Sequence, residues 1–207
     1  MAGFFISFEG IDGSGKSTQS RLLADSLRAQ GRSVTQTREP GGSAGAEEIR
    51  RLVLEGAVDR WSAETEILLF TAARRDHLEK TIRPALARGD IVITDRFADS
   101  TRVFQGLTRG DLTGTVDALH DLMIGVEPDL TLLIDLDPAL GLSRATARAG
   151  AEMRFEDMGL AFQTRARAGF LDLAARKDRF RIIDGTPPPD QVARAVLDAT
   201  LAALRAR

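Results

Sequence analysis

The sequence has no cysteine, no tyrosine and only two histidines among its 207 residues. Without cysteine the chain can form neither a disulfide bond nor a thiolate metal site, and two histidines argue against a histidine-built zinc site. Any metal that the protein binds should therefore be held by oxygen ligands.

Long apolar runs and an excess of basic charge are also missing. No apolar run reaches the ~18 residues of a membrane-spanning helix, and the N-terminal residues lead into a strand-like stretch in place of a signal peptide. The formal net charge is −2, whereas nucleic-acid-binding proteins usually carry a marked basic excess. These absences predict a cytoplasmic protein that binds neither a membrane nor nucleic acid.

Short apolar runs alternate along the chain with longer segments of helical spacing. These runs span 4–8, 33–37, 91–94, 130–134 and 180–183, and polar residues rarely interrupt any of them except 33–37. This pattern is typical of parallel strands that helices cover on both faces. With 43% apolar content, the sequence predicts one α/β domain over 1–207, a three-layer α/β/α sandwich around a five-stranded parallel sheet.

Glycine and proline punctuate the helical segments. Gly31 and Gly89 follow two of them, as glycine commonly does at a helix C-terminus. Pro84 lies inside the long helical pattern from about Ala63 to Arg88. Because proline has no backbone N–H, we expect this helix to kink or restart there.

A glycine-rich segment follows the first apolar run directly. The pattern G-x-x-x-x-G-K-[ST] is matched there by Gly10, Ile11, Asp12, Gly13, Ser14, Gly15, Lys16 and Ser17, followed by Thr18. Between a strand and a helix, such a loop turns its backbone N–H groups toward phosphate oxygens. Lys16 should reach the terminal phosphates of ATP, and the Ser17 hydroxyl should bind Mg²⁺. The segment predicts an ATP-binding P-loop protein with Mg²⁺ as its cofactor.

The magnesium site needs a second ligand, for which the sequence offers two aspartates. Asp95 and Asp135 each end an apolar run, at the carboxyl edge where ligands of open α/β sheets bind. Arg96 follows Asp95 and would place a cation beside the metal carboxylate, which suits a site for two phosphate-bearing substrates. We therefore favour Asp95 as the ligand and keep Asp135 as the alternative.

A P-loop by itself does not distinguish a kinase from a GTPase or an ATP-driven machine. The chain has no Asn-Lys-x-Asp motif for reading guanine and no long insertion that would suit a mechanical ATPase. A small phosphate acceptor is the simpler hypothesis.

Four motifs bear on the acceptor: FEGIDGSGKST at 8–18, TREPGG at 37–42, LLFTAAR at 68–74, and DRF with ST shortly after it at 95–101. Together they resemble the thymidylate kinase family over nearly the whole chain. The resemblance implies the P-loop nucleoside monophosphate kinase fold and phosphorylation of dTMP to dTDP by ATP. It also implies a homodimer.

The resemblance also implies a base and sugar site. Phe70 and Arg74 are spaced i, i+4, so both lie on one face of a helix, where the ring can stack on thymine and the guanidinium can donate to a base carbonyl. Ser100 and Thr101 belong to the same site, with Thr101 facing the imide edge. Phe104 lies under the sugar and leaves little room for a 2′-hydroxyl.

The phosphate contacts come from arginines in this resemblance. Arg38 and Arg96 hold the dTMP phosphate, while Asp12 approaches the 3′-hydroxyl. In-line transfer between bound phosphates needs positioning and charge neutralisation, to which Lys16, Asp95 and Arg96 contribute, and no covalent intermediate.

The segment at about 147–156 resembles the lid of the family and carries Arg148 and Arg154. The P-loop contains no arginine, so we expect these two residues to supply the catalytic one. Arg144, just before the lid, would stack on adenine.

Two alternatives remain open. A deoxynucleoside kinase would need a carboxylate base for a sugar hydroxyl, for which Glu9 is the candidate, although Arg38 and Arg96 make better sense if the acceptor already carries phosphate. The other alternative is a nucleotide-binding regulatory or assembly protein without turnover.

Overall fold

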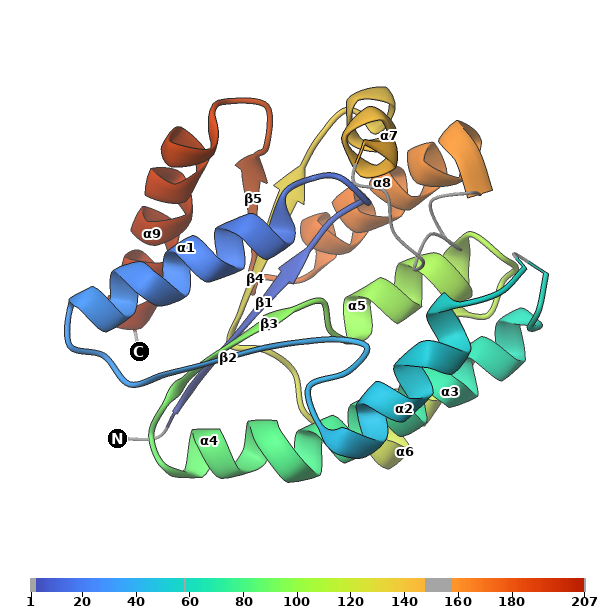
Figure 1. Cartoon of the computed structure of the whole chain (residues 1–207), viewed down its shortest axis with the longest axis horizontal. Helices are drawn as coiled ribbons and strands as arrows, with labels where there is room; N and C mark the ends of the chain where they lie inside the picture. Colours follow the sequence, from blue (N-terminus) through green and yellow to red (C-terminus); the bar gives the residue numbers. More distant parts are fainter. Residues whose placement is uncertain (1–2, 58, 148–157, 207) are drawn as a thin grey trace.

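The computed structural model describes residues 3–57, 59–147 and 158–206. A parallel β-sheet lies at the centre of the fold (Figure 1). The sheet order is β2-β3-β1-β4-β5, with all four pairings parallel. The strands are β1 Phe4–Glu9, β2 Val34–Arg38, β3 Ile91–Asp95, β4 Leu130–Asp135 and β5 Phe180–Asp184. Each strand begins and ends within one residue of a predicted run, so the five-stranded parallel sheet is confirmed.

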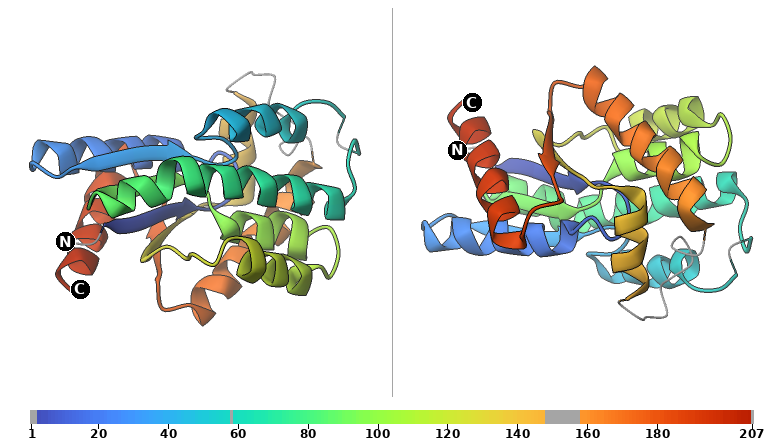
Figure 2. Two further views of the ribbon diagram at one scale, coloured as in Figure 1. Left: turned by 90° about the horizontal axis from the view of Figure 1, so that it is seen from below. Right: turned by 90° about the horizontal axis from the view of Figure 1, so that it is seen from above.

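Helices form a layer on each side of the sheet (Figures 1 and 2). Neighbouring residues of a strand point to opposite faces, so both faces of β1 can be followed separately. Phe4, Ile6 and Phe8 pack in one buried cluster with residues of α1 (Lys16–Ala29) and α9 (Pro189–Arg205). Phe5 packs on the other face with Leu78 and Ala85. This arrangement confirms the three-layer α/β/α sandwich.

The long helical pattern from Ala63 is interrupted shortly before Pro84. It consists of α3 (Ala63–His77), the π-helical segment η1 (Leu78–Ile82) and α4 (Arg83–Ala87). Proline offers no N–H and its ring clashes with the carbonyl group four residues earlier, which is that of Lys80. Because a π-helical turn is wider than an α-helical one, η1 accommodates this conflict. The expected restart at Pro84 is confirmed.

The carboxyl ends of the strands lead into the loops and helices that form the site. β1 is followed by the P-loop, and its neighbours β3 and β4 lie on opposite sides of it, which makes this edge a topological switch point. The remaining helices are α2 (Ala44–Leu54), α5 (Ala98–Thr101), η2 (Arg102–Leu107), α6 (Thr113–Met123), α7 (Pro138–Thr146) and α8 (Gly159–Arg176). Within the described ranges, none of the helices combines the length and apolar character needed to span a bilayer.

Candidate functional site

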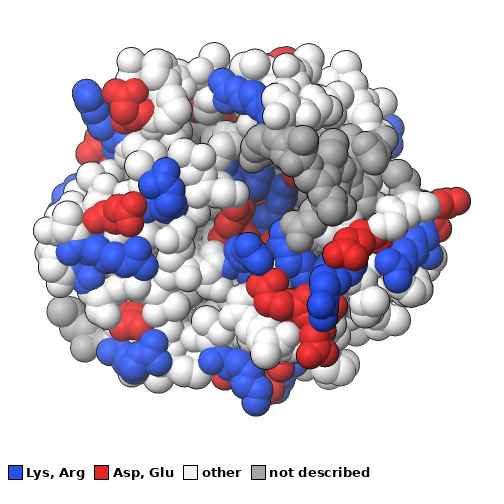
Figure 3. All heavy atoms as spheres, in the orientation of Figure 1, with Lys and Arg blue, Asp and Glu red and all other residues white. Residues whose placement is uncertain are grey.

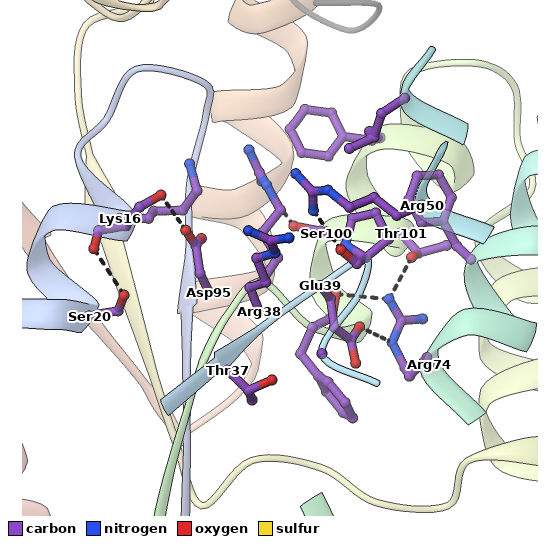
Figure 4. A pocket seen from close by; sticks show the side chains of 18 of the residues that line it. Lys16, Ser20, Thr37, Arg38, Glu39, Arg50, Arg74, Asp95, Ser100 and Thr101 are labelled. Carbon is purple, nitrogen blue, oxygen red and sulfur yellow. Dashed lines mark hydrogen bonds and ion pairs between the residues drawn. The ribbon is translucent and has the colours of Figure 1, made fainter. Parts of the chain in front are cut away.

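A cavity of about 710 Å³ lies at the carboxyl edge of β1, β2 and β3. Figure 3 shows a hollow at the centre of one face of the molecule with basic and acidic side chains inside it, and Figure 4 shows the cavity from close by. The predicted site residues that line the cavity are Asp12, Gly13, Gly15, Lys16, Ser17, Arg38, Phe70, Arg74, Asp95, Arg96, Ser100, Thr101 and Phe104. Residues separated by 92 positions of the chain are thus brought to one place by the sheet.

The P-loop depends on glycine for its course. Gly10, Gly13 and Gly15 all have positive φ, where side chains are strained. A Cβ on Gly13 would lie 1.9 Å from the carbonyl oxygen of Gly141, so only glycine allows α7 to approach the loop. Gly15 forms the N-terminal boundary of α1, whose free N–H groups and dipole favour an anion at this end.

Lys16 folds back over the P-loop. Its Nζ donates to the carbonyl oxygen of Ile11 at 2.7 Å, and the side chain is buried. Burial, followed by the nearby charge of Arg96, lowers the pKa of Lys16 to about 8. The side chain of Ile11 itself packs in a buried apolar cluster, so this residue can offer a nucleotide only its backbone.

Ser17 and Asp95 meet at the start of α1, and together they fit a magnesium ion. The Ser17 hydroxyl donates to Oδ2 of Asp95. Oδ1 of Asp95 is buried and has no hydrogen-bond partner among the described residues. Leaving a buried carboxylate oxygen unsatisfied is unfavourable, and a cation would remove that cost. Hydroxyl and carboxylate oxygens are the ligands that Mg²⁺ prefers, with phosphate and water completing its shell.

Asp135, the alternative metal ligand, is engaged elsewhere. Both of its carboxylate oxygens accept from Arg167 of α8, at 2.7 and 2.8 Å. A bidentate pair of this kind satisfies the carboxylate without a metal. Asp135 is also absent from the cavity lining, so the geometry supports Asp95 in preference to Asp135.

Arg96 lies in a strained turn after β3. Its φ is 71°, in the left-handed region that residues with a side chain rarely adopt. Its backbone N–H donates to the carbonyl oxygen of Phe8 at 2.9 Å. The guanidinium donates to the carbonyl oxygen of Gly10 at 3.0 Å, to Ser100 Oγ at 3.0 Å and to Asp12 Oδ1 at 2.5 Å. The turn thereby holds a cation against the P-loop, where donor and acceptor phosphates would meet.

Glu9 supports this turn from below. Its Oε1 accepts from the N–H of Phe97 at 2.8 Å and its Oε2 accepts from Ser100 Oγ at 2.6 Å. Burial and then the negative charge of Asp99 raise the pKa of Glu9 to about 7. Glu9 does not line the cavity, so it fixes the backbone that carries Arg96 and does not reach a ligand itself.

Phe70 and Arg74 lie one turn apart on α3, at the wall of the same cavity. Arg74 is 4% exposed and its guanidinium lies 5.3 Å from the ring centre of Phe97. Its Nη2 donates to the carbonyl oxygen of Phe97 at 3.2 Å and to Thr101 Oγ1 at 3.0 Å. Phe104 is also in the lining, and its ring stacks on Phe162 with ring centres 5.7 Å apart. Aromatic rings and a fixed guanidinium therefore line the part of the cavity next to α3 and η2.

Two predicted arginines lie at the margins of the cavity. Arg38, at the end of β2, is 55% exposed and pairs with Glu47 at 3.1 Å. Arg144, on α7, is outside the cavity lining and donates to the carbonyl oxygen of Gly185 at 3.3 Å. The lid arginines Arg148 and Arg154 lie outside the described residues.

The family model described as thymidylate kinase matches residues 8–196, which is most of the chain. The chain belongs to the thymidylate kinase family. It is 70% identical to a thymidylate kinase of Ruegeria pomeroyi, covering 96% of this chain and 95% of that one, and 67% identical to one of Dinoroseobacter shibae, covering 94% and 95%. The crystal structure of thymidylate kinase from Ehrlichia chaffeensis is similar with a TM-score of 0.79 at 36% identity, covering 97% of this chain and all of that one.

Three further residues that line the cavity were not predicted from the sequence. Gln105 is buried in the lining, and its Nε2 donates to Glu66 at 3.0 Å, which leaves its Oε1 as an acceptor. It follows Thr101 by four residues, so helical spacing was the available signal. Arg50 of α2 lines the cavity and donates to the carbonyl oxygen of Pro40 at 2.5 Å. The third is Glu39, which lies in the TREPGG motif but whose contacts with Arg74 and His77 depend on the tertiary fold.

Proposed function

We propose that this chain transfers the γ-phosphoryl group of ATP to dTMP, giving ADP and dTDP. The observation that carries the proposal is one cavity that joins a P-loop to an acceptor wall built from Phe70 and Arg74. The relatives matched over nearly the full chain are themselves named thymidylate kinase.

The donor nucleotide binds along the P-loop with its phosphates at the N-terminus of α1. Loop N–H groups hold the phosphates, and Lys16 exchanges its contact with the Ile11 carbonyl oxygen for a terminal phosphate oxygen. The acceptor phosphate is held by Arg38 and Arg96. In-line transfer then follows from positioning and charge neutralisation.

The metal proposed for this reaction is Mg²⁺, with Ser17 and Asp95 as its protein ligands. When bound, it neutralises charge on the β- and γ-phosphates. The buried Oδ1 of Asp95, which has no partner among the described residues, supports this assignment.

Base selection follows from the polar groups on the acceptor wall. Arg74 offers a donor to a base carbonyl group, and Gln105 offers an acceptor for a ring N–H, while Phe70 stacks on the base. Thymine presents a carbonyl and an imide N–H on the edge that meets these groups. Cytosine would present an amino group to the donors of Arg74, a mismatch of roughly 1–3 kcal/mol.

The deoxynucleoside kinase alternative requires a carboxylate within reach of a sugar hydroxyl. Glu9, the candidate base, is buried beneath the turn and both of its oxygens already accept hydrogen bonds. Among the described residues, four acidic ones do line the cavity: Asp95 is the proposed metal ligand, and Asp12, Glu39 and Glu47 pair with Arg96, Arg74 and Arg38. A phosphate acceptor fits this arrangement better than a hydroxyl acceptor.

A coupled assay of ADP release separates the candidate functions. We expect release with dTMP and none with thymidine when each is offered with ATP and Mg²⁺. Release with thymidine in place of dTMP would instead indicate a deoxynucleoside kinase. No release with any nucleoside or monophosphate would indicate a nucleotide-binding protein without turnover.

We further propose that the lid at about 147–156 supplies the catalytic arginine from Arg148 or Arg154. The P-loop positions Ile11, Asp12, Gly13 and Ser14 contain no arginine. Lys16 and the metal meet only part of the charge that develops on the transferred group, so another cation is required.

A homodimer is also proposed. Leu68 of α3 and Leu122 of α6 are 58% and 74% exposed, and these two helices pack against each other. Apolar side chains on adjoining helices are typical of a surface that a second copy covers. Light scattering of the wild type and of Leu122→Glu tests the proposal, because the substitution should release monomers.

The cytoplasmic location stays a prediction of the sequence.

A further inference from the structure

A chain of polar contacts runs from Thr37 in the cavity lining through the buried side chains of His77 and Glu39 to Arg74. Thr37 Oγ1 lies 2.7 Å from Nε2 of His77. Nδ1 of His77 lies 3.0 Å from Oε1 of Glu39, and because a carboxylate only accepts, the proton of this bond is on Nδ1. Oε2 of Glu39 accepts from Nε of Arg74 at 2.7 Å. The chain connects β2, the loop after it and α3.

These contacts are shielded from water. The side chains of Glu39 and Arg74 are each 4% exposed, and that of His77 is 0% exposed. Gly42 closes the loop over them, since a Cβ there would lie 2.4 Å from Nε2 of His77 and 2.4 Å from Thr37 Oγ1. The last glycine of the segment Arg-Glu-Pro-Gly-Gly thus makes room for the histidine.

The contacts fix how the guanidinium of Arg74 is turned (Figure 4). Its Nε is bound to Glu39, and its Nη2 to the carbonyl oxygen of Phe97 and to Thr101 Oγ1. Among the described residues, Nη1 has no protein hydrogen-bond partner, while the side chain lines the cavity. One nitrogen is therefore left to meet a ligand, in one orientation.

We propose that Glu39, held by His77, is a positioning residue that determines base selection by fixing the guanidinium of Arg74. The inference rests on the proposed function and concerns the same site. A guanidinium free to rotate can turn its donors away from a mismatched group, whereas a fixed one leaves donors facing the amino group of cytosine. A wrong base is rejected when it leaves buried polar groups unpaired. By holding the guanidinium, Glu39 keeps the donors of Arg74 unpaired when cytosine occupies the site.

Glu39→Gln is the direct test, with dTMP and dCMP as paired substrates. Glutamine keeps the shape but removes the charge that holds the guanidinium; with its oxygen on Arg74, its amide nitrogen faces Nδ1 of His77, which accepts only in the other tautomer. We expect kcat/KM for dTMP to fall about tenfold or more, mainly through KM, while kcat/KM for dCMP holds or rises. Glu127→Gln is the matched control. It makes the same change in a glutamate that pairs with Arg102, and neither of these two residues lines the cavity.

A second pair of variants separates positioning from general destabilisation. In His77→Asn the amide nitrogen can donate to Glu39 in place of Nδ1, whereas His77→Leu leaves the carboxylate oxygen without that donor. We expect the dTMP-to-dCMP ratio to survive in the asparagine variant and to fall at least about fivefold in the leucine variant. If Glu39→Gln does not fold, the two His77 variants test the positioning role of Glu39 on their own.

Two outcomes overturn the inference. One is unchanged kcat/KM for both substrates in Glu39→Gln and His77→Leu, and the other is an equal fall for both substrates, as simple destabilisation produces; in each case the dTMP-to-dCMP ratio stays at the wild-type value. A wild type that does not phosphorylate dTMP would refute the proposed function instead, so the two failures can be told apart.

Discussion

Replacing Asp95 with asparagine should abolish most of the turnover and leave the fold intact. Oδ1 of Asp95 is buried and has no partner in the part of the chain that the structure describes, and Oδ2 accepts from the Ser17 hydroxyl, which can rotate to accept from an amide in the variant. The free energy of unfolding should therefore change little. Removing one preorganised electrostatic group of an active site typically costs about 10²–10³ in kcat, or about 2.7–4 kcal/mol, and we expect Asp95→Asn to fall in that range.

Asp135→Asn provides the matched control. It breaks the bidentate pair with Arg167, whose side chain is 37% exposed while that of Asp135 is 21% exposed. A pair with this exposure is worth only about 0.5–1 kcal/mol of stability, which lowers the Tm of a chain of this length by about 1–4 °C. Turnover should stay near the wild-type value because Asp135 does not line the cavity.

The assay is kcat at saturating ATP and dTMP over a series of Mg²⁺ concentrations, together with thermal unfolding of each variant. Asp95→Asn should require more Mg²⁺ for half-maximal activity, since it loses a charged ligand. Loss of turnover in Asp135→Asn with loss of stability alone in Asp95→Asn would contradict this prediction, because the metal would then lie at the other strand end.

Three further predictions follow from the charged groups. Burial lowers the pKa of Lys16 to about 8, and bound phosphates must raise this pKa, so the protein should take up protons when it binds ATP at pH 8 and far fewer protons at pH 6. Calorimetry in buffers of different ionisation enthalpy measures this uptake, and no proton uptake at pH 8 would contradict the prediction. The pKa of Glu9 is raised from 4.5 to about 7, so its stabilising contribution is complete below pH 4.5 and is lost as the pH rises through 7. In urea unfolding, the free energy of unfolding of the wild type should fall by up to about 3 kcal/mol relative to that of Glu9→Gln between pH 5 and 8. Parallel pH profiles of the two free energies would contradict this prediction. The double variant Arg148→Met with Arg154→Met should lower kcat at least ~100-fold with little change in KM for dTMP, and more than a tenth of wild-type kcat with chemistry rate-limiting would argue against the lid arginines.

The central strands β1, β3 and β4 were predictable because both of their faces are buried, whereas the edge strands β2 and β5 are partly exposed. Apolar runs such as 91–94 are nearly free of polar interruption, and turns and glycines mark their ends, so each strand could be located within one residue. The P-loop carries its own local signal, because the glycines that its positive φ angles require occur at fixed spacing. The spacing of Phe70 and Arg74 likewise needed only the period of a helix to place both on one wall.

The roles of Glu39 and Glu9 escaped prediction because both act through contacts distant in sequence. Glu39 reaches Arg74 over 35 positions and Glu9 reaches Ser100 over 91, distances at which no sequence period operates. Glu9 could be offered only as a base, because burial beneath a strained turn cannot be read from a single sequence. The engagement of Asp135 with Arg167 is a similar case, since it depends on how α8 packs beside β4.

Steady-state kcat/KM for dTMP, dCMP, dGMP and dAMP, measured side by side with saturating ATP and Mg²⁺, tests the central claim most directly. The acceptor wall of Phe70 and Arg74, together with Gln105, predicts that kcat/KM for dTMP is at least about tenfold higher than for dCMP. The difference from the purine monophosphates should be larger still. Comparable kcat/KM values for dTMP and dCMP would contradict the thymine assignment.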